Sequence, residues 1–233
     1  MIAFDTAGDG LAFDLCGVRV TPLPEGALWI GDSATLIVSD LHLEKGSSYA
    51  ARGVALPPYD TRATLTRLAA VITRLAPRQV VCLGDSLHDR TADARMAAQD
   101  IALISDLARA RRWIWIEGNH DPAPPTHWGG ERLEALTLGP LVLRHAPAAG
   151  PAPGEIAGHL HPVARISGHG RSTRRRSFLT DGARLVMPAF GAYAGGLNAC
   201  DIAFTALFPD GFVALALGRD RVWPAPQSRC LAD

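Results

Sequence analysis

Residues 34–42 read ATLIVSDLH, a short apolar run of β-forming residues that ends in an Asp-x-His sequence. The pattern predicts a buried strand whose end carries Asp40 and His42. Two later stretches repeat it, because residues 80–88 read VVCLGDSLH and residues 113–121 read WIWIEGNHD. Buried strands that each end in polar side chains predict a layered α/β fold with a ligand site at the strand ends.

Helical segments separate these strands. Apolar residues recur at helical spacing between Asp60, a suitable N-cap, and Pro77, which ends the segment. A second amphipathic helix follows the second strand, and its inner face carries Met96, Ile101, Ile104 and Leu107. The order of strand, helix, strand, helix and strand is typical of an α/β fold.

The second half of the chain has little helical periodicity. Short β-rich runs separated by Gly and Pro occupy residues 141–143, 155–157, 184–187 and 212–217. They predict a second sheet packed against the first, with helices outside. We therefore expect an α/β fold of the four-layer αββα type, built from two mixed sheets, as a single domain over residues 1–233.

Composition limits the classes of function. The 233 residues include 23 basic and 23 acidic side chains, so no global field attracts nucleic acid or membrane, and contact with DNA must depend on local patches. The N-terminal segment lacks the features of a secretory signal, and no apolar run approaches the roughly 18–20 residues that span a bilayer. The four cysteines are scattered without metal-binding spacing. These features predict a cytoplasmic protein without membrane contact.

Histidine and carboxylate side chains gather at the predicted strand ends. Six of the eight histidines fall in such motifs: His42, His88, His120, His145, His159 and His161. An extended backbone would point Asp40 and His42, which flank one residue, to the same face, and the same holds for His159 and His161. Imidazole and carboxylate without thiolate suit manganese, iron or zinc.

Each motif alone has an ordinary explanation, because a Gly-Asp pair such as Gly84-Asp85 is a common turn. Together at least seven candidate ligands suffice for two ions that share one carboxylate. Two divalent ions about 3.5–4 Å apart are the usual clamp for displacement at phosphorus. The residues therefore predict a metal-dependent phosphoesterase that uses two metals to activate a bridging water.

The motif order DxH, GDxxH, GNHD, H and GHxH resembles the calcineurin-like metallophosphoesterase superfamily between Asp40 and His161. The resemblance implies one metal bound by Asp40, His42, Asp85 and His161. It implies a second metal bound by Asp85, Asn119, His145 and His159, so that Asp85 bridges. It also implies that His120 contacts the scissile phosphate and assists the leaving group. By this resemblance the catalytic residues are His120 and two of the metal ligands, Asp85 and Asn119.

Three further stretches lie largely outside the metal motifs: residues 40–49 (DLHLEKGSSY), 56–61 (LPPYDT) and 188–198 (PAFGAYAGGLN). Through them nearly the whole chain resembles the ligase-associated DNA damage response endonucleases (the PdeM group). That resemblance implies a manganese-dependent phosphodiesterase that cuts single-stranded DNA in repair. It also implies a functional association with a DNA ligase, a helicase and an exonuclease.

Other side chains are candidates for the substrate. His88 and Asp89 are expected to contact phosphate or to support the ligands. The candidates for contact with DNA are Arg171, Arg174, Arg175, Arg176, Tyr49 and Tyr193. A phosphodiesterase for cyclic nucleotides or other small diesters is the alternative, and the complete ligand set argues against a non-catalytic scaffold. The native metal, the product ends and the oligomeric state, a homodimer included, stay open.

Overall fold

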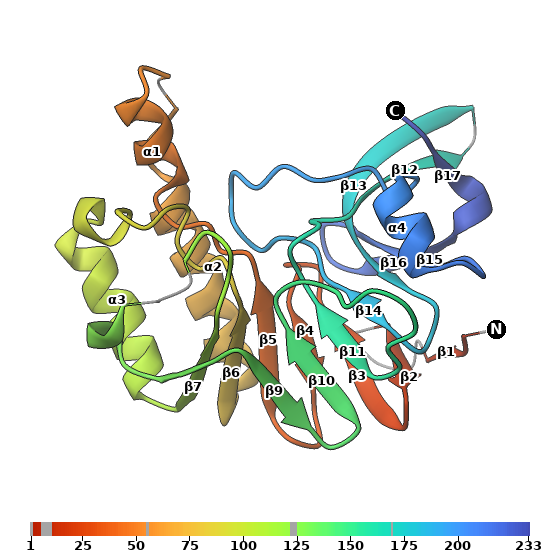
Figure 1. Ribbon diagram of the computed structural model, residues 1–233, viewed down its shortest axis with the longest axis horizontal. Helices are drawn as coiled ribbons and strands as arrows, with labels where there is room; N and C mark the ends of the chain where they lie inside the picture. Colours follow the sequence, from red (N-terminus) through yellow and green to blue (C-terminus); the bar gives the residue numbers. More distant parts are fainter. Residues whose placement is uncertain (1, 6–10, 55, 122–124, 169) are drawn as a thin grey trace.

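Two mixed β-sheets pack face to face, and helices lie on their outer faces (Figure 1). The computed structural model describes residues 2–5, 11–54, 56–121, 125–168 and 170–233. Within these ranges, no helix is both long and apolar enough to cross a membrane. The predicted αββα sandwich of two mixed sheets is confirmed.

The first sheet contains eight strands that follow one another in chain order. β1 to β5 pair antiparallel, whereas β5 to β8 pair parallel. The parallel pairs arise because helices cross over between β5 and β6 and between β6 and β7. The strands are β1 (Phe4–Asp5), β2 (Ala12–Leu15), β3 (Val18–Pro22), β4 (Leu28–Ile30), β5 (Thr35–Ser39), β6 (Gln79–Leu83), β7 (Arg112–Ile116) and β8 (Glu131–Leu133).

The second sheet contains nine strands, seven of which follow the order β16-β15-β13-β14-β11-β10-β9, while β12 pairs with β13 and β17. β10, β11 and β14 pair parallel, and the other neighbours pair antiparallel. The strands are β9 (Ala135–Leu138), β10 (Leu141–Arg144), β11 (Glu155–Ala157), β12 (Val163–Gly168), β13 (Arg171–Thr180), β14 (Leu185–Val186), β15 (Val213–Leu217), β16 (Val222–Pro226) and β17 (Cys230–Leu231).

The helices are distributed unequally between the outer layers. α2 (Asp60–Leu75) and α3 (Ala98–Arg109) cover the first sheet, and a single short helix, α4 (Ile202–Leu207), packs Phe204 against the second. α1 (Lys45–Ala51) projects beyond the sheets (Figure 1). Short 3-10 turns occupy Asp93–Arg95, Thr126–Trp128 and Gln227–Arg229.

The apolar pattern of the sequence matches the observed cores. Leu65, Leu68 and Ile72 of α2 are buried against the first sheet, as their spacing predicts. A separate core fills the space between the sheets. The first sheet contributes Ile37, Val81 and Ile114 to it, and the second sheet contributes Leu143 and Phe178. Burying each such side chain contributes about 1.5–3 kcal/mol, so the sheet-to-sheet core holds the two sets of strand ends in a common position.

The start of α2 differs from the prediction. Asp60 is not the N-cap, because Tyr59 occupies that position and Asp60 is the first helical residue. The Asp60 carboxylate instead accepts a hydrogen bond from the Gly46 backbone N–H at 3.0 Å. A carboxylate in the first turn still complements the helix dipole, and here it also ties α1 to α2.

Candidate metal centre

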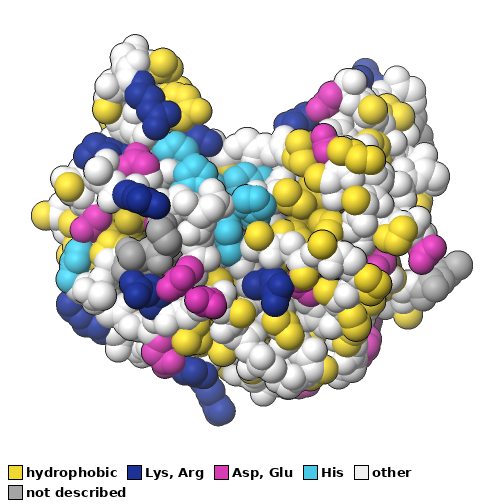
Figure 2. Space-filling model, viewed as in Figure 1, with side chains coloured by type: hydrophobic (Ala, Val, Ile, Leu, Met, Phe, Trp, Pro, Cys, Tyr) yellow, Lys and Arg dark blue, Asp and Glu magenta, His cyan; other side chains and the backbone are white. Residues whose placement is uncertain are grey.

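The predicted ligands lie where strands of both sheets end at one edge. Asp40 follows β5 directly, and one glycine separates Asp85 from β6. From the second sheet, His145 follows β10, and Gly158 separates His159 from β11. Carboxyl ends of parallel strands meet at one edge of a sheet, and the packing of the two sheets brings both edges together. In the space-filling view the histidines gather at the base of a notch (Figure 2).

The backbone at these positions is not extended, which corrects the reasoning from alternation. The φ angles of Asp40 and His42 are 53° and 44°, and those of His159 and His161 are 67° and 47°. Asp85 also has a left-handed φ of 46°. The left-handed conformation costs roughly 1–2 kcal/mol for a residue other than glycine. The expected outcome, paired side chains directed into one site, holds for a different reason: five of the seven ligands, all except Asn119 and His145, have a left-handed backbone.

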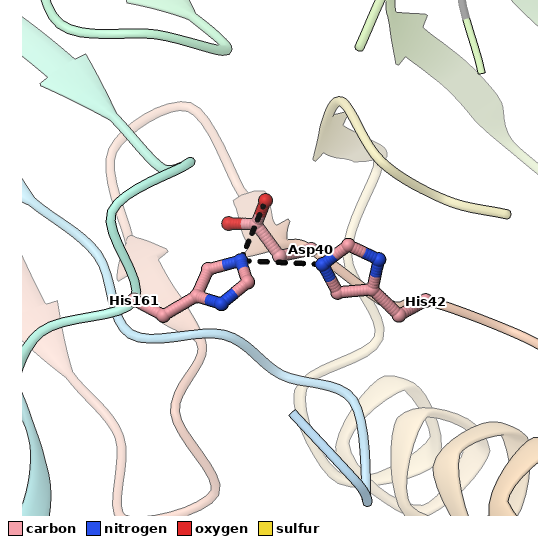
Figure 3. Close-up of side chains that lie close together, drawn as sticks. All are labelled: Asp40, His42 and His161. Atoms are coloured by element: carbon pink, nitrogen blue, oxygen red, sulfur yellow. Dashed lines mark hydrogen bonds and ion pairs between the residues drawn. The ribbon is translucent and has the colours of Figure 1, made fainter. Parts of the chain in front are cut away.

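The first group of converging ligands contains Asp40, His42 and His161 (Figure 3). His161 Nε2 lies 3.2 Å from His42 Nε2 and 3.2 Å from Asp40 Oδ1. Asp40 is fully buried, and its other oxygen, Oδ2, accepts hydrogen bonds from the Ser39 hydroxyl and from the His159 backbone N–H. One carboxylate oxygen is thereby held by the protein while the other faces the imidazoles.

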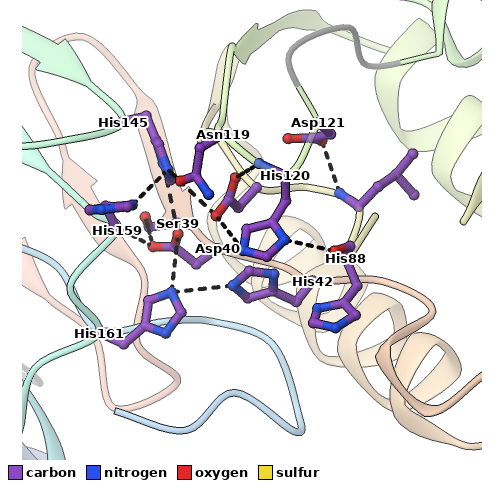
Figure 4. A network of polar contacts seen from close by, with 12 residues as sticks. Ser39, Asp40, His42, His88, Asn119, His120, Asp121, His145, His159 and His161 are labelled. Carbon is purple, nitrogen blue, oxygen red and sulfur yellow. Dashed lines mark hydrogen bonds and ion pairs between the residues drawn. The ribbon is translucent and has the colours of Figure 1, made fainter. Parts of the chain in front are cut away.

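The second group contains Asp85, His145 and His159, with Asn119 beside them (Figure 4). His145 Nε2 lies 2.9 Å from Asn119 Oδ1, 3.1 Å from His159 Nδ1 and 3.5 Å from Asp85 Oδ2. The two groups adjoin, since His145 Nδ1 is 3.8 Å from Asp40 Oδ1. The structure thus brings together all seven predicted ligands.

The proton on His145 shows that this second group suits a cation. His145 Nδ1 lies 3.0 Å from the Leu83 carbonyl oxygen, which can only accept, so Nδ1 carries the proton in the neutral ring. Nε2 then presents a lone pair toward Asn119 Oδ1, which is also an acceptor. A cation bound between them would resolve this repulsion, because both atoms could then donate a lone pair to it.

Comparison with known proteins agrees with this geometry. The model of the calcineurin-like phosphoesterase family matches residues 34–186, which include every predicted ligand. The chain belongs to the calcineurin-like phosphoesterase family. This phosphoesterase is therefore a metal-dependent hydrolase, and its two clusters suit a dinuclear site for divalent ions.

Solved structures resemble the phosphoesterase to different degrees. The crystal structure of Pseudomonas putida nuclease MPE is 25% identical, covers 96% of this chain and 100% of its own, and superposes with a TM-score of 0.70. The phosphoesterase Yfce from E. coli is 15% identical, covers 82% of this chain and 98% of its own, and has a TM-score of 0.42. No curated protein sequence matches the chain.

The electrostatic environment of the phosphoesterase favours the metal-binding protonation states of three ligands. Burial alone would raise the pKa of Asp40, but the hydrogen bond and charge of His161 and the charge of His145 outweigh it and lower the pKa. Burial lowers the pKa of His42 to about 3 and also lowers the pKa of His159. A deprotonated carboxylate and neutral imidazoles are the forms that bind a cation.

His120 stands beside the ligands with one nitrogen fixed. Its Nδ1 lies 2.8 Å from the His88 carbonyl oxygen, so Nδ1 carries a proton, and the two rings stack at 5.5 Å. Nε2 is left 3.9 Å from Asp85 Oδ2, and the side chain is 41% exposed. His120 Nε2 therefore lies at the edge of the metal groups, and its contact with the scissile phosphate stays a prediction.

His88 and Asp89 occupy different environments. The His88 ring lies between Tyr49 and His120, with centroid distances of 6.1 and 5.5 Å, and burial lowers its pKa to about 4. Asp89 pairs with Arg95 at 2.6 Å. Burial alone would raise the pKa of Asp89, but hydrogen bonds from Arg95 outweigh it and lower the pKa. Asp89 thus supports the loop after β6, and the His88 carbonyl orients His120.

The predicted DNA-contacting residues separate into two sets. Arg171, Arg174 and Arg175 are exposed on β13. Arg176 is partly buried, which lowers its pKa, and its guanidinium donates to the Ala189 carbonyl at 2.9 Å. The Tyr193 hydroxyl donates to the Pro57 carbonyl at 2.8 Å. Arg176 and Tyr193 therefore brace residues 188–198, and the exposed Arg174 also donates to the Gly196 carbonyl at 3.0 Å.

Two supporting residues were not predicted. Ser39 is fully buried and donates to Asp40, and a buried serine directly before a ligand is the only signal in the sequence. Asp121 accepts from the Leu87 backbone N–H at 2.9 Å, and burial raises its pKa to about 8. Asp121 is the last residue of the Gly-Asn-His-Asp motif, but the sequence does not show its contact with the loop after β6, which depends on the fold.

Proposed function

We propose that the phosphoesterase is a manganese-dependent endonuclease that cuts single-stranded DNA during repair in the cytoplasm. The observation that carries this proposal is the convergence of seven metal ligands beside His120. The likeness to the Pseudomonas putida nuclease covers 96% of this chain and 100% of the nuclease at 25% identity. By the same proposal the enzyme works in association with a DNA ligase, a helicase and an exonuclease.

The chemistry follows from the residues. Two bound divalent ions would lower the pKa of a shared water and neutralise charge on the phosphate oxygens. Asp40, His42 and His161 would hold one ion, Asn119, His145 and His159 the other, and Asp85 both. His120, positioned by the bond from Nδ1–H to the His88 carbonyl, would in its doubly protonated form donate the Nε2 proton to the departing sugar oxygen and remain neutral with Nδ1–H. Such general acid catalysis typically contributes about 10²–10⁴-fold.

Features beside the centre favour a polymer as the substrate. α1 stands next to the histidines and carries Lys45 and Tyr49, whose charged group and ring lie 6.0 Å apart. Tyr49 adjoins His88, and exposed Arg52 follows the helix. A cation attracts backbone phosphate and an aromatic ring stacks on an unpaired base.

Cleavage assays with chosen substrates test the proposal. Purified enzyme is incubated with single-stranded circular DNA, duplex DNA and cyclic nucleotides across manganese, iron, zinc and magnesium. We expect the fastest cleavage for single-stranded DNA with manganese, and Asn119→Ala should reduce it by at least about 10-fold through loss of one ligand. Hydrolysis of cyclic nucleotides without cleavage of DNA would contradict the proposed substrate.

A further inference from the structure

The four arginines of β13 do not share one surface. Side chains alternate along a strand, and Arg174 and Arg176 both reach residues 188–198, where they donate to backbone carbonyl groups at 3.0 and 2.9 Å. Arg171 and Arg175 belong to the other set of alternate positions. The cluster that looks continuous in sequence is therefore divided between two faces of the strand.

Arg171 and Arg175 line a hollow of about 340 Å³ formed by β12, β13, β15 and β16. The same hollow is lined by Arg229 and by Trp223, whose side chain is 55% exposed. Arg221 lies over the Trp223 ring, 5.0 Å from its centroid. The described residues that line the hollow include no acidic side chain. It thus combines three guanidinium groups with a partly exposed indole, one face of which lies under Arg221.

These groups match one class of ligand. Guanidinium groups without acidic partners attract phosphate, and an exposed indole offers a face for stacking. Duplex DNA keeps its bases inside the stack, so only an unpaired strand presents a phosphate chain and a free base together. Trp223 differs in this from Trp113 and Trp128, which are at most 1% exposed and belong to the core.

We propose that this hollow is a second binding site of the enzyme, for single-stranded nucleic acid. Arg171 and Arg175 contact the phosphate backbone, and a base stacks on Trp223. The site holds the strand without taking part in the chemistry. This inference rests on the proposed function, because a site beyond the metal centre has a role only if the substrate is a polymer.

The hollow is connected to the metal centre by the chain itself. β12, which forms one wall, begins at Val163 directly after the loop that carries His159 and His161. Arg174 and Arg176 of β13 donate hydrogen bonds to backbone carbonyl groups of residues 188–198. In the same segment the Gly191 backbone N–H donates to the Asp40 carbonyl at 3.1 Å. The β12–β13 hairpin lies on the opposite side of the molecule from α1 (Figure 1), so the hollow and α1 would hold separate stretches of a bound strand.

A second copy of the chain is the competing occupant, since Trp223 is on the outermost strand of the ordered sheet path. A two-fold interface would bring the arginines of each hollow toward those of the other copy, and like charges that face each other are destabilising. Charge therefore favours the nucleic acid.

The test measures binding with metal removed by EDTA, so that cleavage does not interfere. The probe is a fluorescein-labelled oligonucleotide of 20 thymidines, followed by anisotropy at several salt concentrations. The variants are Arg175→Glu, Trp223→Ala and the conservative Trp223→Phe. Arg78→Glu is the matched control, because Arg78 is also exposed but precedes β6 in the first sheet. Thermal melting verifies that each variant is folded.

We expect Arg175→Glu to weaken binding at least about 5-fold and to reduce the slope of log K against log salt by about 0.7, the value for one lost phosphate contact. Trp223→Ala should weaken binding by about 5–100-fold, as loss of one stacked base does, and Trp223→Phe should retain most of it. Arg78→Glu should bind more tightly than Arg175→Glu. Hydrolysis of bis(p-nitrophenyl) phosphate should be unchanged in all four variants.

Three results would overturn the second site. These are a wild-type enzyme that does not bind the oligonucleotide, equal losses for Arg175→Glu and Arg78→Glu, and a dimer that Trp223→Ala converts to monomer. Failure of the proposed function looks different. In that case the wild type binds the oligonucleotide and the variants lose binding, yet no metal supports cleavage.

Discussion

Replacement of Gly158 by alanine tests whether close packing behind the ligands controls metal binding. Gly158 lies between β11 and His159. A Cβ added there would lie 1.8 Å from Ser39 Oγ and 2.5 Å from Asp40 Oδ2. Its φ is outside the left-handed region, so the clash rather than the backbone opposes alanine. Ser39 and Asp40, which the added Cβ would meet, are both fully buried, so neither can move into solvent to relieve the clash.

The magnitude follows from the distances. The separation of 1.8 Å is 1.6 Å shorter than the 3.4 Å at which ordinary contact begins. Relieving it requires rotation of Ser39 and loss of its bond to Asp40. Overpacking costs typically about 1–3 kcal/mol, and loss of a hydrogen bond to a buried charged group costs about 1–3 kcal/mol more. Displacement of a residue that supports a ligand lowers metal affinity by about 10–100-fold.

The assay measures metal content by mass spectrometry after dialysis against buffered manganese, together with the melting temperature of the metal-free protein. Gly158→Ala should show weaker binding, and activity should recover at high manganese. Ser39→Ala combined with Gly158→Ala should restore part of the affinity, because the nearest clashing atom is gone. Gly195→Ala is the control, since its Cβ would meet no atom within 4 Å. Wild-type affinity and melting temperature in Gly158→Ala would refute this reasoning.

Three further predictions concern single side chains. Asp85→Ala should reduce bound metal at both positions by at least about 10-fold, measured as metal per chain, and two tightly bound ions in that variant would exclude a bridging role. His120→Ala should lower kcat by about 10²–10⁴-fold with unchanged metal content, because its ring belongs to neither ligand group; loss of metal would show that it is a ligand. Burial raises the pKa of Cys230 to about 11, so its thiolate is scarce below that pH. Alkylation by iodoacetamide, followed by mass spectrometry, should be about 100-fold slower at pH 8 than for an ordinary cysteine and should accelerate as the pH rises toward 11; equal rates would contradict the burial.

Sequence patterns predicted the parallel strands β5, β6 and β7 of the first sheet and the helices α2 and α3, because apolar periodicity reports which side of an element is buried. The strand predicted at residues 80–83 appears as β6, and the spacing of Leu65, Leu68 and Ile72 matches the buried face of α2. The N-terminal strands, β12 and the full extent of β13 were not predicted. In β13 the first five residues are exposed and polar, three of them arginines, so no apolar alternation marks them as a strand.

The ligands were predicted by residue type and order, but their geometry was not. The tight turns at Asp40 and His42 have left-handed φ angles that only the surrounding structure maintains. The four arginines of residues 171–176 form one cluster in sequence, and the strand divides them between two faces.

The sequence by itself determined which side chains are available for metal and phosphate, because the residue types and their positions after apolar runs are local properties. Only the tertiary structure decided how His145 joins Asn119 and how Trp223 joins Arg171 and Arg175. These residues lie far apart along the chain, on different strands or in the loops that follow them. Their distances depend on how the two sheets pack and how strands pair within the second, and local periodicity carries no information about either.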